Sequence, residues 1–193
     1  MIPFLFSKLS AGLIAIERLF LKLLIAALTL TVLMNVLLRM VGITIAWADE
    51  VGIYAMILSG FVGASLMLRA RIDPAVLLLH EFVSEKSRRI LHGLVSLLAA
   101  VFGFMLLYLC IRWFDPVEIA KAGFDVGTFQ ANTFNFIYTD QTSVMAAPSF
   151  LFYFIIPFFS FAITIHAITN MFEDIGWLDR PEDPAGLAMD VVQ

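Results

Sequence analysis

Apolar residues gather in four long runs along this chain, at about 20–45, 51–68, 91–112 and 146–171. The last three runs contain no acidic residue and no lysine. A helix that rises about 1.5 Å per residue needs roughly 20 such residues to cross a hydrocarbon core about 30 Å thick. Helices of soluble domains instead carry an apolar stripe on one face. The pattern therefore predicts an all-α integral membrane protein with four transmembrane helices.

The segment 69–89, between the second and third runs, mixes apolar residues with charged ones within one short stretch. Such a mixture predicts a surface helical segment that lies along the membrane, with its basic residues near anionic lipid headgroups. It would either hold the chain at the membrane surface or serve as a docking surface for another protein.

The loop 115–141, between the third and fourth runs, begins with a helix-start signal. Asp115 is a suitable N-cap, Pro116 fits the first helical position, Glu118 has capping-box spacing, and Gly123 can end the helix. We therefore expect a short capped helix there. The aromatic residues that follow make the rest of the loop too apolar for a solvated linker, so we expect it to fold onto another part of the chain.

Small residues in the second run predict that this span is the most enclosed of the four. Gly60, Gly63 and Ala64 fall at helical spacing, and small residues let two helix backbones approach closely in lipid. The fourth run is instead rich in phenylalanine, with Pro157 in its middle, where we expect a kink. Its aromatic surface would face lipid or grip a second membrane protein.

Composition agrees with a membrane protein: 61% of the residues are hydrophobic, 15% are charged and the mean hydropathy is +0.94. Ordinary globular chains are about 45–50% apolar and about 25% charged. The single cysteine, Cys110, lies inside the third run and excludes an intrachain disulfide. We expect one membrane domain over 1–193, ending in an acidic tail at 173–193.

The basic residues predict the orientation, because short cytoplasmic loops are enriched in Lys and Arg. With both termini in the cytoplasm, most of the 12 basic residues lie on that side. These are Lys8, Arg18, Lys22, Arg69, Arg71, Lys86, Arg88, Arg89 and Arg180. Only Arg39, Arg112 and Lys121 fall outside, so the loop 115–141 is predicted to be the outer loop.

Familiar catalytic motifs are missing from the sequence: it has no Gly-rich phosphate loop, HExxH, GxSxG or Cys/His cluster. No carboxylate falls deep within a predicted span, where ion pathways usually place one. We therefore expect no enzymatic activity, cofactor, metal site or nucleic-acid partner, and no solute transport by this chain alone. One alternative uses His92 and His166 as haem ligands in a four-helix redox protein. Another is a free-standing tetraspan assembly protein.

The turn between the first two runs concentrates polar residues. Asn35 and Arg39 lie one turn apart, Trp47 suits a membrane interface, and Asp49 and Glu50 open the next helix. Arg39 and Glu50 should reach the same membrane edge, either as a pair that anchors this hairpin or as a grip on a partner.

At these residues the chain resembles the small membrane (Q) subunit of tripartite ATP-independent periplasmic (TRAP) transporters. The resemblance covers nearly the whole chain and rests on the residues from Asn35 to Arg39, from Trp47 to Glu50, Gly63 with Ala64, and Arg69. The chain departs from the family at Arg71, where a histidine is common, and in its longer outer loop.

The resemblance implies a scaffold subunit in the bacterial inner membrane that supports a large membrane transport subunit. That partner would hold the substrate and sodium sites of a symporter, and a periplasmic substrate-binding protein would deliver an organic acid to the complex. Ten residues are candidates for partner contact, or for anchoring in membrane lipids. They are Asn35, Arg39, Trp47, Asp49, Glu50, Gly60, Gly63, Ala64, Arg69 and Asp73.

Overall fold

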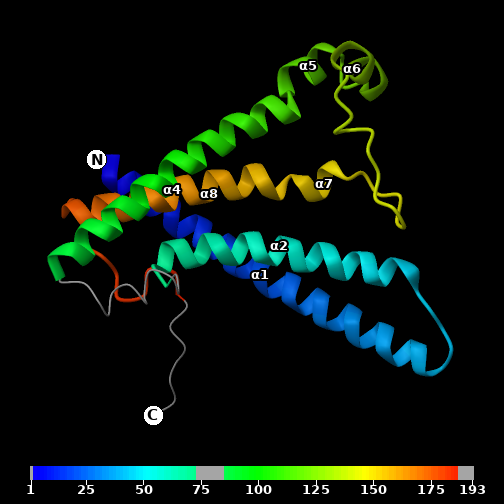
Figure 1. Ribbon diagram of the computed structural model, residues 1–193, viewed down its shortest axis with the longest axis horizontal. Helices are drawn as coiled ribbons and strands as arrows, with labels where there is room; N and C mark the ends of the chain where they lie inside the picture. Colours follow the sequence, from blue (N-terminus) through cyan, green and yellow to red (C-terminus); the bar gives the residue numbers. More distant parts are fainter. Residues whose placement is uncertain (1, 73–84, 187–193) are drawn as a thin grey trace. The chain divides into compact units, whose positions relative to one another are not determined.

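The computed structural model describes residues 2–72 and 85–186, and its elements are helices (Figure 1). In chain order they are α1 (Ile2–Met40), α2 (Ala46–Ala70), α4 (Glu85–Phe114), α5 (Pro116–Lys121), α6 (Val126–Thr133), α7 (Phe150–Tyr153) and α8 (Ile155–Ile175). Four spans are long and apolar enough to cross a membrane, α7 and α8 together forming the last. No strand occurs in the described part of the chain. The predicted all-α, four-span fold is confirmed.

Residues 1, 73–84 and 187–193 lie outside the described residues. Asp73, most of the surface segment predicted at 69–89 and the end of the acidic tail fall there.

The chain forms two compact units, each with buried residues of its own. Unit 1 comprises Met1–Leu21, Val62–Met105 and Phe159–Gln193, and unit 2 comprises Lys22–Phe61 and Leu106–Phe158. The single membrane domain expected over 1–193 stays a prediction.

The first span begins and ends earlier than the predicted 20–45. Its 39 residues make a helix about 58 Å long at about 1.5 Å per residue, almost twice the thickness of a hydrocarbon core of about 30 Å. The helix stops because Gly42 adopts φ 78°, and the Ile43 N–H then donates to the Leu38 carbonyl at 2.9 Å. Glycine at this left-handed position is a common helix terminator.

The fourth span begins at Phe150 and not at 146, because Ala146 still lies in the loop with φ 51°. The helix is interrupted at Phe154, between α7 and α8. Pro157 explains the interruption, since it has no N–H to offer to the Tyr153 carbonyl and its ring crowds that oxygen. The predicted kink is therefore a break that lies three residues before the proline.

The second span is less enclosed than the fourth, so the packing prediction was wrong. In the most apolar window of each span, 22% of the second and 44% of the fourth is buried. A Cβ added at Gly60 or Gly63 would meet no atom within 4 Å, so these glycines face open space in this chain. The small residues that permit close packing are instead on α8, where Ala162 and Ala167 are fully buried.

Part of the aromatic run in the fourth span packs inside unit 2, which neither sequence alternative expected. The Phe152 ring stacks on Tyr54 of α2, with centroids 3.9 Å apart. Phe150 packs against the outer-loop cluster formed by Ile119, Phe129 and Ile137. This part of the run fixes neighbouring elements, while Phe154 and Phe161 stay exposed.

The outer loop confirms the predicted short helix. The Asp115 carboxylate accepts from the Glu118 N–H, and Gly123 at φ 65° ends α5 with the Phe124 N–H bonded to the Ile119 carbonyl. Glu118 does not complete the capping box, because its carboxylate pairs with Lys121 at 2.6 Å. The loop also folds onto other elements as expected, since α6 buries Phe129 beside Tyr138 and Phe114.

Gly103 of α4 gives a test of the close approach between α4 and α8 in unit 1. A Cβ there would run into Thr164 Oγ1 and lie 3.2 Å from both Ile163 Cγ1 and the Ser160 carbonyl. We predict that Gly103→Ala lowers the stability of the purified chain in detergent by about 1–3 kcal/mol, the usual cost of overpacking. Thermal unfolding measures this loss.

Gly93→Ala on the same helix is the matched control, because a Cβ at Gly93 has no atom within 4 Å. Equal melting temperatures for the two variants would show that α4 and α8 do not approach closely at Gly103.

Candidate functional site

The hairpin cluster of unit 2 consists of Asn35, Arg39 and Asp49. Asp49 lies near the start of α2 and accepts hydrogen bonds from Asn35 Nδ2 and from Arg39 Nη2, the latter at 3.0 Å. The Arg39 and Asp49 side chains are 56% and 57% exposed. The suggested Arg39–Glu50 pair is thus wrong: consecutive helical residues point about 100° apart, and Asp49 is the one that faces α1.

Glu50 has a different role, because its carboxylate accepts backbone hydrogen bonds from the loop before the fourth span. The Met145 N–H donates to it at 2.7 Å and the Val144 N–H at 3.2 Å. Glu50 therefore ties the start of α2 to the segment just before the fourth span, within unit 2.

A groove of about 390 Å³ runs beside the hairpin cluster. Its walls are mostly apolar, and they are formed by residues of α1 and α2 such as Leu28, Val32 and Ile53. Asn35, 7% exposed, lines the groove, and its Oδ1 has no hydrogen-bond donor among the described residues. The groove therefore combines an apolar surface with one buried acceptor that lacks a partner.

The polar clasp of unit 1 joins the end of α2 to the end of α8. We define it as Arg69, Arg71, Asn170, Glu173 and Asp174. Arg69 makes a two-bond ion pair with Glu173, at 2.6 and 3.0 Å, and donates to Asn170 Oδ1 at 2.5 Å. Only 4% of the Arg69 side chain and 2% of the Glu173 side chain are exposed. Arg71 pairs with Asp174 at 2.5 Å.

The clasp also satisfies backbone groups where α2 ends. Asn170 Nδ2 donates to the Leu68 carbonyl at 3.0 Å, and Arg71 Nη2 donates to the Asn170 carbonyl at 2.7 Å. Arg71 adopts φ 58°, a left-handed conformation that is uncommon outside glycine and that turns the chain out of α2. Its side chain can then reach back to α8.

A second buried polar group in unit 1 ties α1 to α8. Ser10 Oγ lies 2.8 Å from His166 Nδ1, and Glu17 Oε2 lies 3.0 Å from His166 Nε2. Ser10, Glu17 and His166 are each at most 1% exposed. Sequence reasoning began the first span at about 20, whereas α1 begins at Ile2 and therefore includes Glu17.

Both ring nitrogens of His166 are thus engaged by the protein. A haem iron would have to displace Ser10 or Glu17 from the ring, so the geometry argues against the haem alternative. The described residues contain no group of three or more His, Cys, Asp or Glu that would hold a metal ion.

The sequence model of a known family, described as tripartite ATP-independent periplasmic transporters, DctQ component, matches residues 28–176. The match covers well over half of the 193 residues and includes the hairpin cluster and the whole polar clasp. The chain belongs to this family. No curated protein and no solved structure matched the chain. The predicted resemblance is confirmed, and the chain is a multi-pass membrane component of a TRAP transporter.

The ten candidate residues fall in different places in this DctQ family member. Asn35, Arg39 and Asp49 come together, Arg69 is enclosed in the clasp, and Trp47 is 46% exposed on the first turn of α2. Gly60 and Ala64 are exposed on α2, with Gly63 half-buried, and Asp73 lies outside the described residues.

Sequence reasoning missed the α8 half of the clasp, formed by Asn170, Glu173 and Asp174. The signal was present, because Asn170 and Glu173 are three residues apart and share a helix face at the end of an apolar span. It also missed Ser10 and Glu17, which lie before the segment that matches the DctQ family.

Arg69 gives the test of the clasp. We predict that Arg69→Ala lowers the stability of the DctQ chain in detergent by about 3–5 kcal/mol, because it leaves the Glu173 carboxylate buried without its partner. Arg69→Met combined with Glu173→Gln should recover part of this loss, since neither buried charge remains. Thermal unfolding of both variants measures the difference.

Lys121→Ala is the control, because it also removes a positive charge from an ion pair, here the exposed pair with Glu118. Exposed pairs contribute little to stability, so the melting temperature should stay nearly unchanged. If Arg69→Ala also melted at the wild-type temperature, the clasp would contribute nothing to stability.

Proposed function

We propose that this chain is the scaffold subunit of a sodium-driven, binding-protein-dependent symporter that takes up an organic acid. The family match over 28–176 is the observation that carries the proposal. The large membrane subunit of the same transporter would hold the substrate and sodium sites, and a periplasmic binding protein would deliver the solute. The complex would lie in a bacterial inner membrane with both termini of this chain in the cytoplasm, and reporters fused to the termini test that orientation.

The arrangement of the buried charges supports a structural role. Glu17 pairs with His166, Glu173 with Arg69, and Asp174 with Arg71. An ion pathway needs carboxylates that bind and release a cation, whereas these three are held by side chains of the same unit. Sodium would therefore bind the larger partner.

The hairpin cluster and its groove support a contact with the large subunit. The exposed Arg39–Asp49 pair, the unpartnered Asn35 Oδ1 and the apolar groove lie together in unit 2. A helix of the large subunit seated in the groove would cover apolar surface, place a donor on Asn35 and shield the ion pair from water. This is the combination of packing and interhelical hydrogen bonds that drives association in lipid.

Reconstitution in vesicles tests the transport proposal. This chain alone should move no organic acid, because the described residues contain no group of three or more His, Cys, Asp or Glu that could hold a cation. With the large subunit and the loaded binding protein, uptake should need a sodium gradient and should not respond to ATP. Vesicles without this chain but with both partners are the control and should show little uptake. Uptake by this chain alone would refute the scaffold role.

The hairpin proposal predicts that Arg39→Ala reduces the amount of large subunit that co-purifies with this chain. It would leave Asp49 charged beneath the partner, where a buried charge without its ion partner is costly. The double variant Arg39→Met with Asp49→Asn should recover part of the complex. Quantitative pull-down from membranes, together with sodium-driven uptake, measures both effects.

Lys121→Ala again serves as the matched control, since it breaks an exposed pair on α5, away from the groove. Full assembly and uptake with Arg39→Ala would mean that the pair stays in water, where such a contact contributes only about 0–1 kcal/mol.

A further inference from the structure

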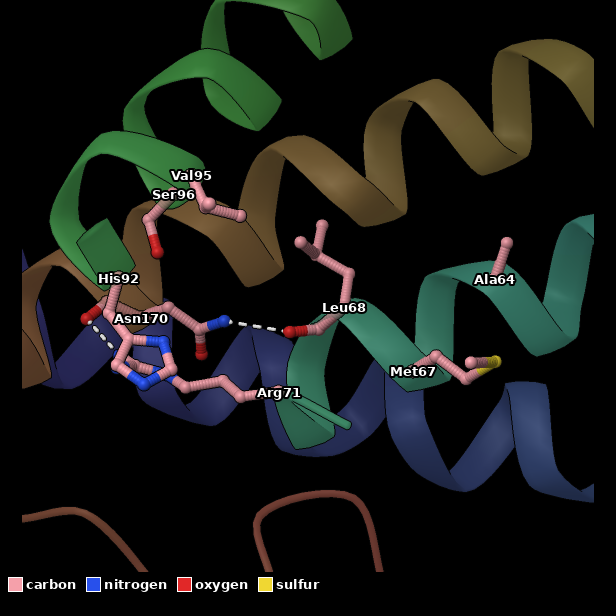
Figure 2. Close-up of a pocket in the computed structure, with 8 residues that line it drawn as sticks. All are labelled: Ala64, Met67, Leu68, Arg71, His92, Val95, Ser96 and Asn170. Carbon is pink, nitrogen blue, oxygen red and sulfur yellow. Dashed lines mark hydrogen bonds between the residues drawn. The ribbon is translucent and has the colours of Figure 1, made fainter. Parts of the chain in front are cut away.

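A cavity of about 170 Å³ lies in unit 1 beside the polar clasp, between α2, α4 and α8. It is lined by Ala64, Met67, Leu68, Arg71, His92, Val95, Ser96 and Asn170. Figure 2 shows His92, Ser96 and Asn170 together at one end of the cavity and Ala64 and Met67 at the other. The cavity thus has a polar end and an apolar end.

The polar end offers hydrogen-bond donors, and none of the described residues that line it is a carboxylate. Ser96 and Asn170 are 3% and 1% exposed, and only 7% of the Arg71 side chain is exposed. Arg71 Nε is buried, and it finds no hydrogen-bond acceptor in the described part of the chain. A buried guanidinium N–H without an acceptor is costly, so this end of the cavity suits an anion.

Arg71 belongs to a group of charged side chains near the ends of α2 and α8 in unit 1. Arg69, Arg71 and Arg180 interact with two carboxylates, Glu173 and Asp174, which leaves one positive charge in excess among these five groups. Burial lowers the pKa of Arg180, and repulsion by the positive charge of Arg71 lowers it further. An anion near Arg71 would relieve that repulsion.

The apolar end of the cavity favours a lipid over a free anion as the ligand, because a free anion would leave this apolar surface uncovered. Ala64, Met67, Leu68 and Val95 line it, and Ala64 and Met67 are exposed on the side of a transmembrane helix. The polar end lies where α2 stops at Ala70, and headgroups meet the acyl chains near the ends of a transmembrane helix. Basic pockets between transmembrane helices bind anionic headgroups in this way.

We propose that this cavity binds an anionic phospholipid. Its phosphate accepts from Arg71 and Ser96 at the polar end, and the first part of an acyl chain covers Ala64 and Met67. A bound inorganic phosphate shares the headgroup chemistry but leaves the apolar end uncovered.

The test uses the full chain, purified in detergent and stripped of lipid, with phosphatidylglycerol as the probe. Phosphatidylglycerol should bind at one molecule per chain and raise the melting temperature. Phosphatidylcholine with the same acyl chains, and inorganic phosphate alone, should do so far less. Native mass spectrometry measures the stoichiometry, and thermal unfolding measures the stabilisation.

Two variants locate the site. Arg71→Lys keeps the charge but removes the Nε donor together with the Nη donors to Asp174 and Asn170, and it should weaken phosphatidylglycerol binding by at least about tenfold. Ala64→Leu fills the apolar end without touching the clasp and should weaken binding as well. Gly60→Leu is its matched control, exposed one turn earlier on α2 and outside the cavity.

Three results would overturn the proposal. Equal stabilisation by phosphatidylcholine would indicate general lipid solvation. Equal stabilisation by inorganic phosphate would indicate a free-anion site. Unchanged phosphatidylglycerol binding in Ala64→Leu, at a wild-type melting temperature, would place the lipid elsewhere on the chain.

Discussion

The ion pair between Arg69 and Glu173 is the contact on which the rest of unit 1 depends. Lipid and packed side chains cannot solvate a charge, so a guanidinium and a carboxylate buried this fully are tolerable only together. Their two parallel hydrogen bonds also fix direction, because the flat guanidinium meets the carboxylate edge in one orientation. The last turn of α2 is therefore held at one rotation against the last turns of α8.

Backbone groups reinforce this rotational setting. The Leu68 carbonyl accepts from Asn170, and the Asn170 carbonyl accepts from Arg71, so each helix supplies a partner for the other where α2 ends. A rotation of α8 by one residue would move Asn170 and Glu173 by about 100° and break the bonds to Arg69 and Leu68 together. Arg71 adopts a left-handed conformation at this point, and its side chain reaches Asp174 and the Asn170 carbonyl of α8.

Local signals in the sequence predicted the features that depend on neighbouring residues. Apolar length predicted four spans, and Asp115, Pro116 and Gly123 predicted α5, because a helix cap acts within one turn.

Contacts between distant residues were not predictable in this way. Glu17 seemed to lie before the first span, because the uninterrupted apolar run begins only after Lys22. Its partner His166 is 149 positions away, so the contact could not be inferred from neighbouring residues. The choice between Asp49 and Glu50 for Arg39 depended on the register of α2, which a difference of one residue reverses. The enclosure of α8 was hidden because phenylalanines dominate its first turns, where the buried Ser160 and Ala162 alternate with Phe159 and Phe161.

The two polar clusters differ in what they leave for other molecules. In the clasp, the paired oxygens and guanidinium groups of Arg69 and Glu173 are enclosed, so a partner protein would gain little by approaching them. In the hairpin cluster, more than half of each charged side chain is exposed and one buried acceptor of Asn35 lacks a donor. Desolvating such a pair helps assembly only if the covering surface supplies a donor and keeps both charges together. The hairpin therefore favours a partner with a complementary polar group at that depth over a uniformly apolar helix. A contact of this kind would set the height of the partner in the membrane as well as its affinity, which is what the proposed scaffold role requires.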